Sequence, residues 1–276
     1  MRALLATEFY KLIKQSRTYY ALAAIFVIEG VVLFSAYYQG AGIIDIVLSN
    51  LKDTFYFEGN LLNGNLVTYF ILNSLWFHVP LILIIIMSGL LTTEYKDKTL
   101  QTVMMQPVKK WQYIFSKYIV AIVFTTCVVF VLALTSFLLS YALFGKGDLI
   151  VYVNGLTFFE HDDALLRLIY AFIVGAVSMV FFSVVSVTLA VIFKEAMKTW
   201  IIAAFFLILS NILLKVDFGS ELLNKLLYVK LNDTWQYFFT FEIPWNTIYT
   251  NVALLIAYTL LTMGVGVYVF QKKDIG

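Results

Sequence analysis

The 276-residue sequence has few of the residues that mark disulfide-bonded, metal-binding or nucleic-acid-binding proteins. Its single cysteine, Cys127, excludes an internal disulfide framework and a cysteine-based zinc site. Charged residues make up only 13% of the chain and the net charge is +2, which argues against nucleic-acid binding through bulk positive charge. The sequence contains no G-x-x-x-x-G-K-[ST] loop, no His-Glu-x-x-His motif and no G-x-S-x-G motif. We therefore expect no catalytic residue, cofactor or metal in this chain.

Hydrophobic residues are abundant instead, at 62% of the chain, whereas about 45–50% is usual in soluble domains. A soluble fold cannot bury so much apolar surface, and a disordered chain requires low hydrophobicity and high net charge. The composition therefore predicts that lipid surrounds most of this protein.

Six apolar stretches are candidates for membrane-spanning helices, which need about 20 residues to cross a hydrocarbon core of about 30 Å. They are residues 19–38, 67–91, 118–144, 168–193, 200–214 and 247–270. The fifth stretch would be only about 22 Å long as a helix, so it is either a half-crossing or a full crossing that borrows flanking residues. The sequence predicts one all-α integral membrane domain over residues 1–276.

The placement of lysine and arginine predicts the orientation of these spans, because such residues are enriched in cytoplasmic loops. Thirteen of the 19 fall in the N-terminal segment, in the loops after the second and fourth spans, and in the C-terminal tail. A half-crossing fifth span would put Lys272 and Lys273 outside, which the same bias disfavours. We expect six crossings of the cell membrane, with both termini in the cytoplasm.

Residues 1–18 are predicted to form a basic amphipathic helix before the first span. Leu5, Phe9, Leu12 and Ile13 share one helical face, and the basic side chains lie mostly on the other. Such a helix is expected to lie in the cytoplasmic interface and contact membrane lipids. A solvated, positively charged flank explains this segment equally well.

The loop after the second span is longer than a turn requires. Leu100, Val103 and Met104 share a helical face, Pro107 stops the helix, and Lys109 and Lys110 follow. The pattern predicts a short cytoplasmic helix over residues 94–107 whose apolar face docks onto a partner. The alternative is that this helix packs back against its own spans.

This loop resembles the cytoplasmic loop of ABC-2-type permeases, the membrane subunits of one class of ATP-binding-cassette transporters. Glu94 matches the acidic residue that ends the second span, Lys98-Thr99-Leu100 the Gly-Thr-Leu triplet that begins the coupling helix, and Pro107-Val108-Lys109 the Pro-Val/Leu-Ser-Arg stretch before the third span. Lys98 in place of glycine, and Lys109-Lys110 in place of Ser-Arg, depart from the family pattern and keep the loop cationic. The N-terminal helix, the six spans and the closing residues 270–275 extend the resemblance over the whole chain.

The resemblance implies a permease for ATP-driven export that couples to a separate ATPase subunit, in which ATP and Mg²⁺ would bind. The residues it assigns to this coupling are Glu94, Thr99, Leu100, Val103, Met104, Pro107, Lys109 and Lys110. It also implies two ATPase copies and a second permease, either an identical copy in a homodimer or a homologous chain. The rival hypothesis is a non-transporting membrane scaffold or immunity component that binds an ATPase or another partner.

Two further features carry open alternatives. Glu29 lies deep in the first span, where a charge should face the bundle interior, a water-filled cavity or a partner. It is either a transport-pathway carboxylate or a hydrogen-bonded structural residue. The segment 215–245 resembles the outer re-entrant or interfacial helices of such permeases, with an apolar face that includes Leu222 and Leu223; an aromatic interface belt is the alternative.

Overall fold

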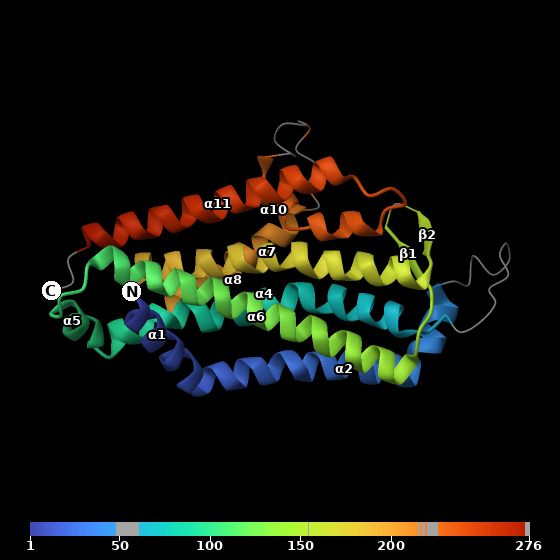
Figure 1. Cartoon of the computed structure of the whole chain (residues 1–276), viewed down its shortest axis with the longest axis horizontal. Coiled ribbons are helices and arrows are strands. Elements are labelled where there is room, and N and C mark those ends of the chain that lie inside the picture. The colour runs from blue at the N-terminus through green and yellow to red at the C-terminus, as the bar shows by residue number, and fades with distance from the viewer. Residues whose placement is uncertain (48–60, 154, 215, 217–218, 220–225, 274–276) are drawn as a thin grey trace.

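Six long helices form a bundle in the computed structural model, which describes residues 1–47, 61–153, 155–214, 216, 219 and 226–273 (Figure 1). The long helices are α2 (Ser16–Val47), α4 (Gly64–Lys96), α6 (Lys110–Phe144), α7 (His161–Phe193), α8 (Ala196–Leu214) and α11 (Trp245–Lys272). Each of them contains a segment long and apolar enough to cross a membrane. The predicted count of six is therefore confirmed, and every predicted stretch lies within one of these helices.

The start of α1 (Arg2–Lys14) and the end of α11 lie at the same end of the bundle, as an even number of crossings requires (Figure 1). The same end carries α5 (Thr99–Met104), and we call it the α5 end. The opposite end carries two short antiparallel strands, β1 (Leu149–Tyr152) and β2 (Leu156–Phe159), and we call it the hairpin end.

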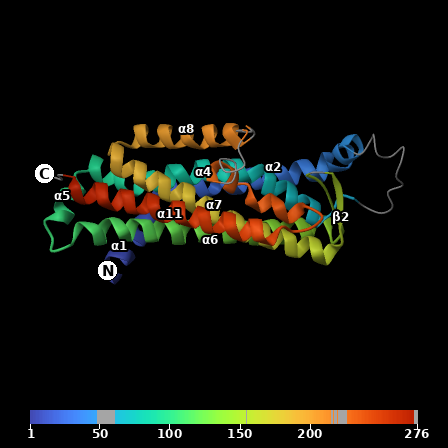
Figure 2. The same cartoon turned by 90° about the horizontal axis from the view of Figure 1, so that it is seen from above.

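Helix α7 is the central element of the bundle, because it packs against α4, α6, α8 and α11. Figure 2 shows α8 on one side of α7 and α6 on the other. Gly175 of α7 accommodates the ring of Trp76 from α4, and a Cβ at that position would come within 1.7 Å of the ring. Gly266 of α11 allows a similar close approach, since a Cβ there would lie 1.8 Å from the Tyr118 hydroxyl of α6, whereas Gly264 faces open space.

The strand pair at the hairpin end was not predicted. Leu149 pairs with Phe159 and Tyr152 with Leu156, and Gly155 takes a positive φ of 154° in the turn. Two amides at the start of α4 hold the approach to this hairpin, since Asn63 donates to the carbonyl of Asp148 (2.7 Å) and Asn65 to that of Gly147 (2.8 Å). These bonds tie the hairpin to α4.

The segment between α8 and α11 contains α10 (Tyr228–Leu231) and a 3-10 helix, η1 (Thr234–Phe239). The hydroxyl of Tyr258, in the middle of α11, donates to the carbonyl of Leu226 (2.7 Å). Nearer the hairpin end, the Asn251 amide donates to the Thr234 hydroxyl (3.1 Å). From Leu226 to Thr234 the segment therefore lies alongside α11, between the middle of that helix and its hairpin end. The predicted apolar residues Leu222 and Leu223 lie outside the described residues.

Candidate functional site

Helix α5 is shorter than predicted and occupies residues 99–104 rather than 94–107. Lys98 takes a left-handed conformation (φ 55°), which ends α4 and turns the chain into α5. Glu94 therefore belongs to α4, and α5 ends three residues before Pro107. A left-handed backbone conformation favours glycine, and here it is adopted by Lys98.

The apolar face of α5 is turned toward its own bundle. Leu100 is 1% exposed and packs in an apolar cluster with Leu12 and Tyr113, and Val103 and Met104 are half-buried against the same cluster. The periodicity predicted these three residues as one face, but in this structure Leu100 has no surface left for a partner. It fixes α5 to the bundle instead.

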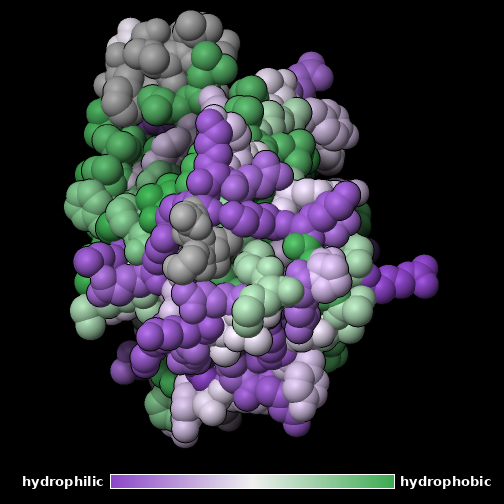
Figure 3. All heavy atoms as spheres, turned by 90° about the vertical axis from the view of Figure 1, so that its left-hand side faces the viewer, coloured by the Kyte–Doolittle hydropathy of each residue, from purple (hydrophilic) through white to green (hydrophobic). Residues whose placement is uncertain are grey.

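The outward surface of α5 and the following turn is formed by other residues. Met105 is 80% exposed, and Thr99, Gln101, Gln106 and Pro107 are exposed as well. Figure 3 looks onto this end, where hydrophilic side chains predominate. Met105 is thus a large apolar side chain that protrudes from a hydrophilic surface.

Four charged side chains form a closed ring beneath α5, and we call it the ion ring: Glu8, Lys11, Glu94 and Lys117. The Lys117 ammonium lies 2.7 Å from Glu8 and 3.0 Å from Glu94. The Lys11 ammonium lies 3.0 Å from Glu8 and 2.7 Å from Glu94. The ring joins three elements, namely α1 (Arg2–Lys14), the last turns of α4 and the start of α6.

Burial makes the charges of the ion ring costly in free energy unless they are paired. Lys117 is 0% exposed and Glu8 is 2% exposed, whereas Lys11 opens to solvent at 36%. Lys117 donates hydrogen bonds to Glu8 (2.7 Å) and to the carbonyl of Leu90 (2.8 Å), and its contact with Glu94 is an ion pair. Two positive and two negative charges balance, and a buried pair of this kind is tolerated only when its partners are all present.

The pKa values of two ring members predict how the ring responds to pH. Burial alone would raise the pKa of Glu8, but the charges of Lys117 and Lys11 outweigh it and hold that pKa below its usual value of 4.5. Burial would lower the pKa of Lys11, but Glu94 and Glu8 raise it above 10.5. The Glu8 contribution to stability is therefore complete above pH 4.5 and is lost as pH falls through its depressed pKa. The Lys11 contribution is complete below pH 10.5 and is lost only above it.

We expect acid to weaken the docking of α1. Between pH 7 and pH 3, the melting temperature of the wild type in detergent should fall more steeply than that of Glu8→Gln, because the variant lacks the carboxylate that must be protonated. Carboxylates outside the ion ring titrate equally in both proteins, so the difference between the two profiles reports on the ring. Parallel profiles would show that the ring does not contribute.

The remaining predicted loop residues have separate positions. Lys109 is exposed just before α6 begins. Lys110 is half-buried and donates to the carbonyl of Lys273 (2.8 Å), which ties α6 to the end of α11. Of the two lysines, Lys109 has the side chain available to a partner.

Helix α1 differs from the predicted helix over residues 1–18, because the chain is extended at Gln15 and α2 begins at Ser16. Leu12 is buried while Ile13 is 52% exposed, so only part of the predicted apolar face packs inward. Arg17 crosses α4 at Gly89, where its guanidinium donates to the glycine carbonyl (2.7 Å). A Cβ on Gly89 would lie 1.7 Å from the Arg17 guanidinium, so any other residue there would displace the end of the arginine side chain.

Glu29 lies between α2 and α6 and is 1% exposed. Its carboxylate accepts hydrogen bonds from the hydroxyls of Thr135 (3.0 Å) and Ser136 (2.9 Å) on α6. The bundle-interior position expected for a membrane carboxylate is what the structure shows, and these bonds hold α2 against α6. No exposed surface links Glu29 to a substrate in this conformation.

A second polar feature lies on the outward faces of α4 and α8, which pack against each other. Asn73 and His78 of α4 and Asn211 of α8 are exposed on the single chain. Asn73 and His78 are about 14 Å and 21 Å from the hairpin end of α4, and Asn211 is about 22 Å from the start of α8 at the α5 end, so all three lie within bilayer depth. Each asparagine donates to a carbonyl of its own helix, Asn73 to that of Tyr69 (2.9 Å) and Asn211 to that of Leu207 (2.9 Å).

His78 behaves in the same way, since its Nδ1 lies 2.7 Å from the carbonyl of Ser74. A carbonyl can only accept, so Nδ1 carries the proton and Nε2 is left facing outward. The outward faces of α4 and α8 therefore present exposed polar side chains at a depth where lipid offers no hydrogen bonds.

Sequence reasoning missed Glu8 and Lys117 as site residues, although the sequence held a signal for each. Glu8 is the only acidic residue among the first 18, and Lys117 adjoins an apolar run with Tyr118 after it. Buried charges require partners, so an isolated acid and an isolated lysine near two helix ends are candidates for pairing.

Comparison with known proteins agrees with the resemblance. A family model described as ABC-2 family transporter protein matches residues 4–211, which is more than half of the 276 residues. No match was found among curated proteins. The matched region includes α1, the ion ring, α5 and the polar face of α4 and α8. The chain therefore belongs to the ABC-2 family of transporter proteins, which are membrane components that are not themselves catalytic and generally partner an ATPase subunit.

Proposed function

We propose that this chain is the permease of an ATP-binding-cassette exporter and that the α5 end faces the cytoplasm, where it binds a separate ATPase subunit. The observation that carries the proposal is the form of α5: a short helix, fixed from behind by buried Leu100, with Met105 protruding outward. The distribution of lysine and arginine supports this orientation. ATP and Mg²⁺ would bind in the ATPase.

Force from the ATPase would reach the bundle through rigid contacts. α5 leaves α4 through two residues only, and Glu94 anchors the end of α4 to α1 and α6 through the ion ring. A displacement of α5 would therefore move α4 rather than bend a loose loop. Such motion transmits work only if the bundle has two alternative packings that the ATPase distinguishes.

The polar face of α4 and α8 is the transport pathway that we propose. Asn73, His78 and Asn211 lie at bilayer depth, where polar side chains face a bundle interior, a water-filled cavity or a partner. A second copy of this chain, related by a twofold axis, would face its own α4 and α8 toward these residues. The pathway would then lie between the two copies, with one ATPase bound to each.

ATP-dependent labelling at residue 73 tests this function without knowledge of the cargo. Asn73→Cys is made in a Cys127→Ser background, and the complex with the ATPase is reconstituted into vesicles and treated with a water-soluble maleimide. ATP should change the labelling rate several-fold, because turnover alternately opens and closes the pathway.

Val27→Cys, on the exposed apolar face of α2, is the matched control and should remain unreactive with and without ATP. ATP hydrolysis with no change at residue 73 would instead support a scaffold that binds the ATPase and moves no cargo.

A further inference from the structure

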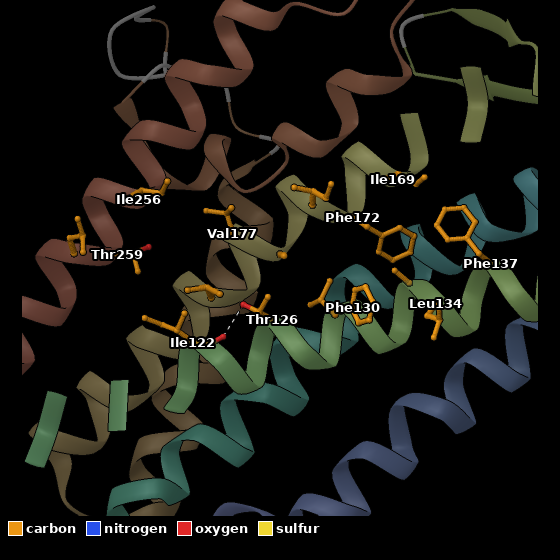
Figure 4. A pocket seen from close by; sticks show the side chains of 16 residues that line it. Ile122, Thr126, Phe130, Leu134, Phe137, Ile169, Phe172, Val177, Ile256 and Thr259 are labelled. Atoms are coloured by element: carbon orange, nitrogen blue, oxygen red, sulfur yellow. Dashed lines mark hydrogen bonds between the residues drawn. The ribbon is translucent and has the colours of Figure 1, made fainter. Parts of the chain in front are cut away.

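An apolar groove of about 810 Å³ lies between α6, α7 and α11. Figure 4 shows side chains of α6, such as Phe130 and Leu134, facing those of α7 and α11 across it. The groove lies away from the polar face of α4 and α8, because α6 and α8 are on opposite sides of α7 (Figure 2). It belongs to neither the α5 site nor the proposed pathway.

Among the described residues, the lining of the groove is almost entirely apolar. Its only lining residues with hydroxyls are Thr126 and Thr259. Thr126 donates to the carbonyl of Ile122 (2.9 Å), and Thr259 donates to that of Leu255 (2.8 Å). All the other lining side chains are apolar. Burying a polar group here would cost free energy without a compensating hydrogen bond, so the groove suits hydrocarbon alone.

The groove covers part of the membrane thickness and closes toward the α5 end. On α7 its lining runs from Ile169 to Val180, which is about 12 to 29 Å from the hairpin end of that helix. Toward the α5 end it closes, because the Tyr118 hydroxyl bonds to Thr188 (2.7 Å) and lies against Gly266 of α11. Figure 1 shows α6 and α11 close together at the α5 end and separating toward the hairpin end. The groove is thus about 17 Å long on α7 and, from Ile122 to Phe137, about 22 Å long on α6, which is shorter than a hydrocarbon core of about 30 Å.

A helix from a second copy does not fit this shape. A spanning helix must cross both leaflets, whereas the groove closes near the middle of the bundle. Helix pairs in membranes also prefer small side chains at their contact, and large ones such as Phe130, Phe137 and Phe172 line the groove. A flexible acyl chain meets neither obstacle.

Aromatic side chains occupy the rim at the hairpin end, where a lipid would place its headgroup. Trp245 and Tyr249 stack at the start of α11 with ring centroids 5.9 Å apart, and both are exposed. Such rings favour the headgroup level of a bilayer. We propose that the groove binds one acyl chain of a phospholipid from the leaflet at the hairpin end.

Photo-labelling with lipid tests the proposal on the full chain. The protein is reconstituted into phosphatidylcholine vesicles that contain a trace of phosphatidylcholine with a diazirine on one acyl chain, irradiated and mapped by mass spectrometry. Adducts should concentrate on the α6 and α7 residues of the groove. Their yield should exceed the yield at Phe34 of α2, an apolar residue about as exposed as Phe130 of the groove. In Ala133→Phe, which fills the groove, its labelling should fall about tenfold.

Ala23→Phe, the same substitution on the exposed face of α2, is the matched control and should leave groove labelling unchanged. If Ala133→Phe lowers the yield of folded protein on size-exclusion chromatography, the smaller Ala133→Leu carries the same expectation. Equal labelling of the groove and of Phe34, or no loss on filling, would overturn the proposal. A disulfide between two copies of Leu134→Cys in a Cys127→Ser background would also overturn it, by showing that a second chain covers the groove.

Discussion

Replacing Lys117 with methionine should destabilise the protein by about 3–5 kcal/mol, the usual cost of removing one partner from a buried ion pair. Lys117 is fully buried and is within 3.0 Å of both Glu8 and Glu94. Without it, two buried carboxylates share only Lys11, and a net negative charge remains among buried side chains. Methionine keeps most of the side-chain volume, so the loss reports on charge rather than on a cavity.

The double variant Lys117→Met, Glu8→Gln should recover most of this loss, because it restores the charge balance with Lys11 and Glu94 still paired. Lys198→Met is the matched control, since Lys198 pairs with Glu195 at the surface and both side chains are more than half exposed. Surface pairs of this kind contribute about 0–1 kcal/mol. Unfolding free energies measured in detergent should therefore separate the two lysines clearly. Equal losses from Lys117→Met and Lys198→Met would refute the ion ring as a structural clamp.

The second large effect is expected at Met105. A carboxylate in Met105→Glu should weaken binding of the ATPase by about 30-fold or more, as loss of an interface hot spot worth at least about 2 kcal/mol does. Met105 is 80% exposed, so the substitution leaves the fold of the chain unchanged. Leu100→Asp would be a poor test of the same contact, because it places a charge inside the bundle's own apolar cluster.

Tyr152→Glu at the hairpin end is the control, since Tyr152 is similarly exposed and lies far from α5. Affinity is read from titration of the purified chain with the ATPase, and melting temperature confirms that both variants fold. Wild-type affinity in Met105→Glu would remove α5 from the interface.

The sequence was sufficient for the spans because the length and apolarity of a membrane helix are set by the bilayer, independently of packing. The same reasoning could not find the ion ring. Glu8 and Lys117 are 109 residues apart, and Lys11 and Glu94 are 83 apart, so no local spacing connects them. Their pairing depends on how α1, α4 and α6 pack, which periodicity does not specify.

Periodicity also identified the shared face of α5 without its direction. Leu100, Val103 and Met104 do lie on one face, but that face meets the bundle and Met105 points away from it. Pro107 predicts a later end for α5 than the structure has. The left-handed turn at Lys98 precedes the first residue of the helix, and the helix ends at Met104. The hairpin could have been predicted, since Asn154-Gly155 separates two β-branched and aromatic runs.

A photo-cross-linking amino acid at position 105 gives the most direct measurement of whether α5 docks onto an ATPase. After irradiation in cells that express the chain, adducts are purified and identified by mass spectrometry, with position 152 as the control. We predict that position 105 captures a protein containing a G-x-x-x-x-G-K-[ST] loop, and that position 152 does not. Adducts at position 105 that contain only lipid, or only proteins without that loop, would contradict the coupling role of α5.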